Sequence, residues 1–418
     1  MALLPVEEAQ VRLLSKALPL EAVETLPLRA ARGRVLASDV TARLTQPPFN
    51  ASAMDGYALR AEDAQQPGAE LAVIGQSAAG HDFCGTIAAG QCVRIFTGAP
   101  VPAGADCVLI QEDTEKLGDG SRIRTTFQAV AGRHIRPRGQ DFAEGSVLVA
   151  AGTRLDYAKL MLAASGNNAE VSVYRKPVIA LLATGDELIT PGSQPGPTQI
   201  IASNTFAITA LAEDLGAEVL DLGLVPDDRA AIVAAIRKAQ AAGADVLVTT
   251  GGASVGDHDF VQAALVEAGM VLDFWKIAMR PGKPLMVGRL GPMHVLGLPG
   301  NPVSSMVCSL LFLEPLIARL AQAPSLQRLR HARTAIALAA NDQRQDYIRA
   351  KLRTDAEGGL WASGFPKQDS SMMQIFSKAD GLIVRPPHAP ALREGGRCCV
   401  LLLHPQAPLA TVHPGEHD

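Results

Sequence analysis

Glycines and carboxylates crowd two loops in the middle of the chain, each directly after an apolar run. Residues 184–187 (TGDE) follow VIALLA, and residues 249–259 (TTGGASVGDHD) follow DVLV. Gly-rich turns expose backbone N–H groups that bind phosphate, and carboxylates are the ligands that Mg²⁺ prefers. One aspartate here would indicate only a helix cap, whereas their concentration predicts a magnesium and phosphate site. The candidate metal ligands are Asp186, Glu187, Asp257 and Asp259.

Cations follow in residues 276–284 (KIAMRPGKP), which carry Lys276, Arg280 and Lys283 around a Pro-Gly turn. Such a run is often a solvated surface, but flanking prolines and apolar strands favour a fixed oxyanion clamp. The segment LPGNPVSS comes next, with Pro299 in a turn and Pro302 in the first turn of an apolar helix. A helix N-terminus of this kind also attracts anions.

Three further loops lie in the first half of the chain. Residues 47–58 (PPFNASAMDGYA) present Asp55 beside a glycine, although an isolated Asp-Gly pair indicates only a turn. Thr97 stands at a strand exit in RIFTG. Residues 133–145 (RHIRPRGQDFAEG) combine Arg136 with Asp141, which fits either an oxyanion grip or a surface ion-pair network.

The elements that must position these loops fall into four groups. Short strand-like pieces separated by Gly, Pro and Asp predict a β-rich, barrel-like domain over 27–145. Apolar strands alternating with helices over 177–327 predict a three-layer α/β domain with a parallel sheet, closed by a long helix at 302–321 that Pro315 interrupts. Strand-like pieces over 328–418 predict a C-terminal β domain resembling a barrel. Helical patterns at 5–18 and 156–166 predict a small linker domain made of 1–26 and 146–176.

Composition narrows the class of protein. With 418 residues the chain exceeds one hydrophobic core, so it is predicted to be a multidomain α/β plus β protein. The formal net charge of −4 excludes a global attraction to nucleic acid or to an anionic membrane. The six cysteines lie in apolar settings without a C-x-x-C pair, no apolar run is long enough for a membrane span, and no signal-peptide pattern opens the chain. These features predict a soluble cytoplasmic protein.

Seven motifs in a fixed order carry a resemblance to a known family. They are PPFNASAMDGYA, TGAPVPAGADCV, RPRGQDFAEG, ATGDEL, TTGGASVGDHD, RPGKP and LPGNPVSS. Together they closely resemble the molybdopterin molybdenumtransferase family, known as MoeA, to which the gephyrin E domain is related. The resemblance runs from residue 1 to about residue 405, and TTGGASVGDHD and LPGNPVSS are its most specific motifs.

The resemblance implies an activity that the residues alone do not name. Molybdate, the substrate, would be inserted into the dithiolene of adenylated molybdopterin, with hydrolysis that releases AMP and with Mg²⁺ assistance. It also implies a homodimer whose active site combines the α/β domain of one subunit with the β-rich domain of the other. An upstream adenylyltransferase and downstream cofactor-handling proteins are the implied protein partners.

Residues matching the family's functional positions can be named one by one. In the β-rich domain they are Asp55, Thr97 and Asp141. In the α/β domain the implied catalytic positions are Glu187, Asp228 and Asp259. Lys276, Arg280 and Lys283 match the cationic segment, with Arg280 where a lysine is common, and Asp257 stands where a glutamate is common. The cleft positions are Ser254, Pro299 and Pro302.

Two other functions fit parts of the sequence. A non-catalytic scaffold or molybdopterin-binding protein of the gephyrin type is one, and retention of Asp55, Asp141, Glu187 and Asp259 disfavours it. A molybdopterin adenylyltransferase is the other, because the α/β domain is similar to that smaller family. The added β segments at 27–145 and 330–405 disfavour that alternative.

Overall fold

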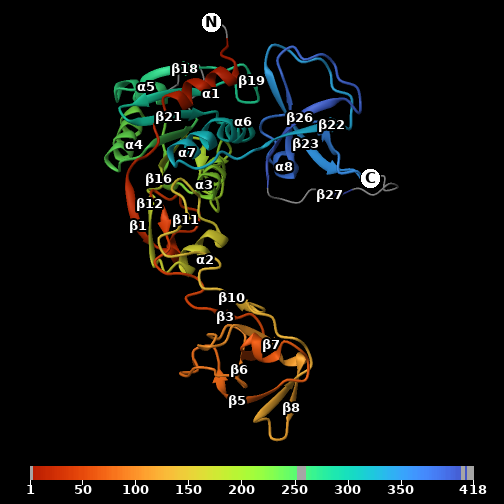
Figure 1. The fold of residues 1–418 in the computed structure, drawn as a ribbon. Coiled ribbons are helices and arrows are strands. Elements are labelled where there is room, and N and C mark those ends of the chain that lie inside the picture. The colour runs from red at the N-terminus through yellow and green to blue at the C-terminus, as the bar shows by residue number, and fades with distance from the viewer. Residues whose placement is uncertain (1–2, 252–259, 406–409, 412–418) are drawn as a thin grey trace. The chain divides into compact units, whose positions relative to one another are not determined.

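The computed structural model describes residues 3–251, 260–405 and 410–411. The chain divides into two compact units, labelled by element in Figure 1. Residues 25–173 form one unit, and they interrupt the sequence of the other, which is made of residues 1–24 and 174–418. The two ends of the interruption are neighbours within the larger unit, because the Arg175 N–H donates to the Ala22 carbonyl at 2.9 Å.

A six-stranded sheet in the order β16-β13-β17-β21-β20-β18 is the centre of the larger unit. Only β20 runs antiparallel to its neighbours; the other pairings are parallel. Alternate residues of β13 face opposite sides, with Leu181 in one core and Leu182 in the other, which explains its continuous apolar sequence. The strands are β13 (Val178–Thr184), β16 (Glu218–Val225), β17 (Val246–Thr250), β18 (Val271–Trp275), β20 (Met286–Leu290) and β21 (Met293–Leu298).

Helices cover both faces of this sheet and confirm the three-layer prediction. On one face lie α4 (Arg229–Ala241) and α5 (Phe260–Glu267). On the other lie α3 (Asn204–Asp214), the long helix described below, and α1 (Val6–Ser15). The structure differs here from the sequence-based grouping of 1–26 with 146–176, because the apolar face of α1 is buried in the α/β core.

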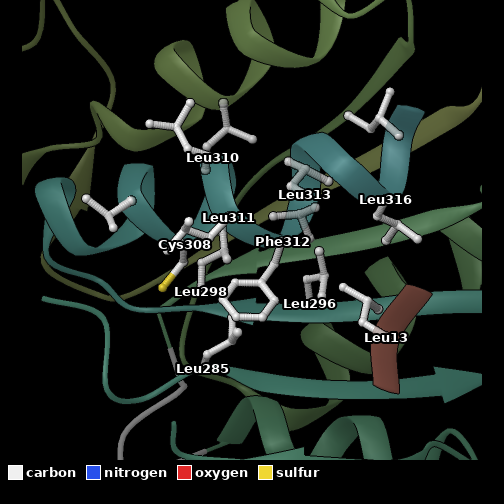
Figure 2. Close-up of a cluster of buried hydrophobic side chains, with 14 of the residues drawn as sticks. Leu13, Leu285, Leu296, Leu298, Cys308, Leu310, Leu311, Phe312, Leu313 and Leu316 are labelled. Carbon is white, nitrogen blue, oxygen red and sulfur yellow. The ribbon is translucent and has the colours of Figure 1, made fainter. Parts of the chain in front are cut away.

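The long helix is continuous but changes its winding. It comprises α6 (Pro302–Cys308), a π-helical turn over Ser309–Leu313, and α7 (Glu314–Leu320). Pro315 has no N–H and its ring crowds the preceding turn, so a wider turn just before it relieves the clash without ending the helix. Phe312 points toward Leu296 and Leu298 of β21 in the cluster shown in Figure 2, and Leu313 belongs to the same cluster.

Residues 302–320 have the length and apolar composition that a membrane span requires, the one such helix in the part of the chain that the structure describes. However, 83% of its most apolar window is buried inside the protein. The position of this helix in the protein core therefore accounts for its apolar composition.

The C-terminal domain is a closed barrel, as predicted. Five strands pair in the order β23-β24-β22-β26-β25, and β25 pairs again with β23 to close the ring. Small and branched side chains such as Ala350, Ala362 and Val400 fill its interior. The strands are β22 (Leu329–Thr334), β23 (Gln345–Thr354), β24 (Leu360–Gly364), β25 (Gly381–Arg385) and β26 (Arg397–Leu402), and two short strands also pair with β23, namely β19 (Met279–Arg280) and β27 (Ala410–Thr411).

The smaller unit contains a second six-stranded sheet in the order β7-β4-β6-β5-β9-β8. Its strands are β4 (Gly56–Leu59), β5 (Glu70–Ser77), β6 (Gln91–Ile95), β7 (Cys107–Ile110), β8 (Thr114–Leu117) and β9 (Arg122–Thr125). This sheet confirms the prediction of a β-rich domain. Residues 31–40 have a different neighbourhood, since Leu36 and Val40 pack with Val149 and Ala163 in a separate small core.

The remaining elements are short. Two of them, β1 (Val23–Pro27) and β12 (Glu170–Tyr174), cross the boundary between the units. In the smaller unit the others are β2 (Val40–Thr41), β3 (Ala51–Ser52), β10 (Ile135–Arg136), β11 (Val147–Val149), α2 (Tyr157–Ser165) and the 3-10 turns η1 (Leu28–Ala30), η2 (Ala61–Ala64) and η3 (Gln111–Asp113). In the larger unit they are β14 (Leu188–Ile189), β15 (Ile200–Ile201) and α8 (Met373–Lys378).

Candidate active site

Asp55 and Thr97 meet in the smaller unit. The Asp55 Oδ1 atom accepts hydrogen bonds from the Thr97 backbone N–H at 2.7 Å and from the Thr97 hydroxyl at 2.8 Å. The backbone bond, followed by the hydroxyl bond, lowers the pKa of Asp55, and Arg94 contributes in the same direction. Among the described residues no group hydrogen-bonds to Oδ2. The pair therefore presents an ionised carboxylate with one oxygen available to a ligand.

The glycine after Asp55 is required by a close approach between strands. A Cβ atom on Gly56 would lie 2.0 Å from the Leu109 carbonyl oxygen of β7. Asp-Gly is therefore not a simple turn here: Gly56 begins β4 and lies directly against β7. This contact fixes the backbone from which the Asp55 side chain extends.

Arg136 and Asp141 lie in segments next to the Asp55 loop. Strand β3 has the Thr97 region on one side, where the Gly98 N–H donates to the Ser52 carbonyl at 2.8 Å, and β10 on the other, with Arg136 opposite Ala51. The Arg136 side chain is exposed. Asp141 is also exposed, and its N–H donates to the Gln46 carbonyl at 3.1 Å.

Three of the predicted acidic residues gather at one edge of the α/β sheet. Thr184 at the end of β13 pairs with Val225 at the end of β16, so the loops that follow these strands are neighbours. Asp186 Oδ1 accepts a hydrogen bond from the Asp227 N–H at 3.1 Å, and Glu187 is exposed. Asp228 caps α4 by accepting from the Ala231 N–H at 2.8 Å.

The donor types at this edge fit magnesium. Asp186 and Glu187 offer exposed carboxylate oxygens, and Mg²⁺ uses only one or two protein carboxylates beside water and phosphate. Within the described residues there is no group of three or more His, Cys, Asp or Glu side chains placed to hold a metal ion. The predicted residues Ser254, Asp257 and Asp259 lie outside the described residues.

Two buried hydroxyls at the same sheet edge have no hydrogen-bond partner among the described residues, a feature that the sequence does not indicate. They belong to Thr184 and Thr249, at or next to the ends of β13 and β17. Gly251 follows with φ +97°, and a Cβ there would lie 2.7 Å from the Thr184 carbonyl oxygen. The turn after β17 therefore requires glycine, as a Gly-rich anion-binding loop does.

The cationic segment is only partly available to an oxyanion. Lys276 adopts φ +67°, and its ammonium lies 4.2 Å from the centre of the Trp275 ring. Lys283 is exposed. Arg280 instead forms ion pairs with Asp346 and, at 3.3 Å, with Asp342, and these carboxylates raise the pKa of Arg280, Asp346 having the larger effect.

The C-terminal barrel contacts the helix that follows LPGNP. Pro299 is buried and Pro302 begins α6. The Val303 N–H donates to the Ser370 carbonyl at 3.1 Å, and the Asn301 side-chain amide donates to the Ser370 hydroxyl at 2.9 Å. One N–H at the predicted anion-binding helix end is thus already satisfied by the barrel.

A cavity of about 420 Å³ lies where this barrel meets the cationic segment. Asp346 and Arg385, both largely buried, line it together with Arg280 and Gln368. No local pattern in the sequence distinguishes Asp342, Asp346 or Gln368 from surface residues. The parallel pairing of β19 with β23 places Arg280 opposite Asp346, the ion pair with Arg280 places Asp342 there, and Gln368 lines the cavity.

Three protein-family models match consecutive parts of the chain. "MoeA N-terminal region (domain I and II)" matches residues 4–166, "Probable molybdopterin binding domain" matches residues 180–319, and "MoeA C-terminal region (domain IV)" matches residues 331–403. The chain belongs to the MoeA family. The resemblance carried by the seven motifs is thereby confirmed.

Curated relatives and solved structures agree with this membership. A protein of Haemophilus influenzae named molybdopterin molybdenumtransferase is 38% identical over 86% of this chain and 89% of its own length. A Bacillus subtilis protein of the same name is 34% identical over 91% of this chain and 90% of its own length. The crystal structure of a molybdopterin biosynthesis MoeA protein from Pyrococcus horikoshii matches with a TM-score of 0.80 and 30% identity, over 96% of this chain and 99% of that one. The relatives' shared name identifies the family as one of enzymes, as the motifs implied.

Proposed function

We propose that this chain is a molybdopterin molybdenumtransferase that inserts molybdate into the dithiolene of adenylated molybdopterin and releases AMP, as a step in molybdenum cofactor biosynthesis. The names of relatives that are 34–39% identical support this proposal. The observation that carries the proposed mechanism is the Asp55–Thr97 pair, because it holds an ionised carboxylate whose Oδ2 atom accepts no hydrogen bond from the described residues.

The proposed hydrolysis follows from this geometry. Asp55 Oδ2 accepts a hydrogen bond from the attacking water and orients it toward a phosphorus of the phosphoanhydride. The bridging P–O bond of the phosphoanhydride breaks to give AMP and the phosphate of molybdopterin, and the proton released by the water passes to the medium. Molybdate and the pyrophosphate are both oxyanions, so Lys276 and Lys283 supply the positive charge that binds them. No protein nucleophile is needed.

Magnesium enters the proposal through the α/β-domain carboxylates. Asp186 and Glu187, together with Asp257 and Asp259 of the following loop, are the residues that would hold it. When bound, Mg²⁺ neutralises phosphate oxygens and thereby weakens the phosphoanhydride bond. Chelation is therefore expected to abolish AMP release while the protein stays folded, which circular dichroism checks.

An assay of AMP release tests the function. Purified protein, adenylated molybdopterin, molybdate and Mg²⁺ are combined, and AMP is measured by chromatography. Asp55→Asn is expected to reduce the rate by about 100-fold or more, the scale on which loss of a positioned catalytic group acts. Asp119→Asn is the matched control, since Asp119 also accepts a backbone N–H, that of Ser121, but does so in the turn between β8 and β9.

The outcomes separate the alternatives. AMP release by the wild type with no effect of Asp55→Asn would remove Asp55 from the mechanism. No AMP release by a folded wild type that still binds molybdopterin would favour a scaffold of the gephyrin type. Synthesis of adenylated molybdopterin from ATP would instead indicate an adenylyltransferase.

We further propose a cytoplasmic homodimer in which two subunits contribute residues to one reaction, and which receives its substrate from the adenylyltransferase. A mixture of Asp55→Asn and Glu187→Gln subunits, unfolded and refolded together, tests this. Mixed dimers are expected to regain up to about a quarter of wild-type activity, because random pairing makes half of the dimers mixed and each has one intact site. Activity no greater than that of either variant alone would contradict shared sites.

A further inference from the structure

Arg94 lies on the strand that leads to Thr97 and contacts the residue that follows Asp55. It belongs to β6 (Gln91–Ile95), and its guanidinium lies 5.1 Å from the centre of the Tyr57 ring and 4.9 Å from the centre of the Phe96 ring. Aromatic faces on this scale attract a planar cation and limit its motion. The Arg94 head group is therefore held in one place.

The guanidinium closes a ring of contacts that includes the Asp55 backbone. Its Nη1 donates to the Gly56 carbonyl at 3.1 Å, and its Nη2 donates to the Gln111 side-chain carbonyl at 2.7 Å. The Gln111 backbone N–H in turn donates to the Asp55 carbonyl at 3.1 Å. Asp55 and Gly56 are adjacent in the chain, so Arg94 and Gln111 hold both of their carbonyl groups.

We propose that Arg94 is a positioning residue for Asp55, fixing the backbone that carries the carboxylate and favouring its ionised form. This inference rests on the proposed function, in which Asp55 orients water. Arg94 acts through Asp55, because its donors are directed at Gly56 and Gln111. Among the described residues, no Arg94 donor hydrogen-bonds to Asp55 Oδ2.

The geometry requires an arginine. Its fork sends two N–H groups in fixed directions to two different acceptors while the guanidinium stays in contact with the Tyr57 and Phe96 rings. A lysine retains the charge but offers a single mobile ammonium that cannot reproduce both bonds and the stacking. Arg94→Lys therefore keeps the positive charge near Asp55 while removing the contacts that position the Asp55 backbone, so it tests the two effects separately.

The charges around Asp55 give the direction of the electrostatic effect. After the two Thr97 hydrogen bonds, Arg94 is the charged group that lowers the pKa of Asp55. Other charged or titratable residues on segments packed nearby are Glu112 and Asp113 of η3, Arg136 of β10, and His134 and Arg138, which hydrogen-bond to the loop that carries Asp55. Because the folded pKa of Asp55 is depressed, the carboxylate stays ionised to lower pH than usual, and removing Arg94 raises that pKa.

The test compares Arg94→Met, Arg94→Lys and Gln111→Met with Arg124→Met. Arg124 is a matched control, since it lies on β9 of the same sheet and pairs with Glu70. The readouts are the Asp55 carboxyl pKa from an NMR pH titration, the acid limb of the pH profile for AMP release, the separate values of kcat and KM, and the thermal unfolding midpoint.

The proposal predicts a specific pattern. Arg94→Met raises the Asp55 pKa, moves the acid limb of the pH profile to higher pH, and lowers kcat by roughly 10-fold or more with little change in KM. Arg94→Lys keeps the pKa near the wild-type value but still lowers kcat. Gln111→Met lowers kcat without moving the pKa, and Arg124→Met changes neither.

Two results would overturn the proposal. One is a folded Arg94→Met protein with wild-type Asp55 pKa and wild-type kcat. The other is an Arg94→Lys protein with full kcat, which would leave charge alone as the role. If Arg94→Met does not fold, Arg94→Lys and Gln111→Met decide the matter. The NMR titration needs no substrate, so a wild type without AMP release would contradict the proposed function and leave the Asp55 pKa measurement valid.

Discussion

The ion pair between Arg328 and Glu314 gives the sharpest stability prediction. Both side chains are almost fully buried, with 9% and 6% of their surfaces exposed, and Arg328 Nη2 lies 2.7 Å from Glu314 Oε2. Arg328 Nη1 also donates to the carbonyls of Leu402 and Leu403 at 2.9 and 2.7 Å. The pair therefore joins the long helix of the α/β domain to the last barrel strand and its exit.

Replacing Glu314 with glutamine leaves a buried guanidinium without its counter-charge. Breaking a buried pair in this way costs about 3–5 kcal/mol, because the remaining charge is neither solvated nor paired. For folding units of this size, each 1 kcal/mol lowers the midpoint by roughly 2–4 °C, so the expected drop is roughly 6–20 °C. The two tryptophans, Trp275 and Trp361, both belong to the larger unit, so tryptophan fluorescence follows its thermal unfolding specifically.

Glu267→Gln is the control for this experiment. It removes the same charge from an ion pair with Arg229 in which both side chains are about half exposed, and water solvates the arginine that remains. Its midpoint is expected to change by only a small fraction of the Glu314→Gln shift. The double variant Glu314→Met with Arg328→Met is expected to recover much of the loss in unfolding midpoint, because no charge remains buried. Equal shifts for Glu314→Gln and Glu267→Gln would refute the reasoning from burial.

Three other predictions concern single side chains. Gly56→Ala places a methyl group against the Leu109 carbonyl and is expected to lower the unfolding midpoint of the smaller unit, measured by circular dichroism, by several degrees; no change would show that β4 and β7 separate easily. Burial lowers the pKa of His294 to about 4. Between about pH 6.5 and 4 the unfolded chain therefore binds more protons than the folded protein, and the free energy of unfolding falls as the pH drops through that window. Denaturant titrations at several pH values should show that the free energy of unfolding depends less on pH in His294→Asn than in the wild type. The same pH dependence in both proteins would contradict this. Arg280→Lys keeps the charge near Asp346 but loses the fork, so AMP release should stay within a few-fold of wild type; a complete loss would show that guanidinium geometry is essential.

The sequence predicted the α/β domain well because its strands are buried on both faces. The continuous run in β13 and the helical patterns of α3 and α4 are local signals, and each led to the observed element. The pattern over 35–40 also looked like a strand of the β-rich domain. It packs instead with the region of α2, because an apolar segment alone does not specify which core it joins.

The sequence predicted the position of candidate site residues that lie together in one loop. Asp186 and Glu187 lie at the sheet edge where the order of strands and helices placed them. The carboxylate partners of Arg280 were not predictable, since Asp342 and Asp346 lie more than 60 residues away in the chain and pair with it only through β19 and β23. Likewise, the contact of Thr97 with Asp55 links two motifs that the sequence presents separately.

The hydrogen bond between Arg175 and Ala22 has a consequence for the modularity of this chain. The segment 25–173 leaves and re-enters the larger unit at adjacent points, as a guest domain does in a host. A short glycine-rich linker in place of the guest should therefore close the host without straining it. Such a host would carry the α/β sheet and the barrel without Asp55 and Thr97, and the excised guest would carry that pair alone. Ligand binding by the Asp55–Thr97 pair and by the residues of the α/β domain could then be measured on two separate proteins.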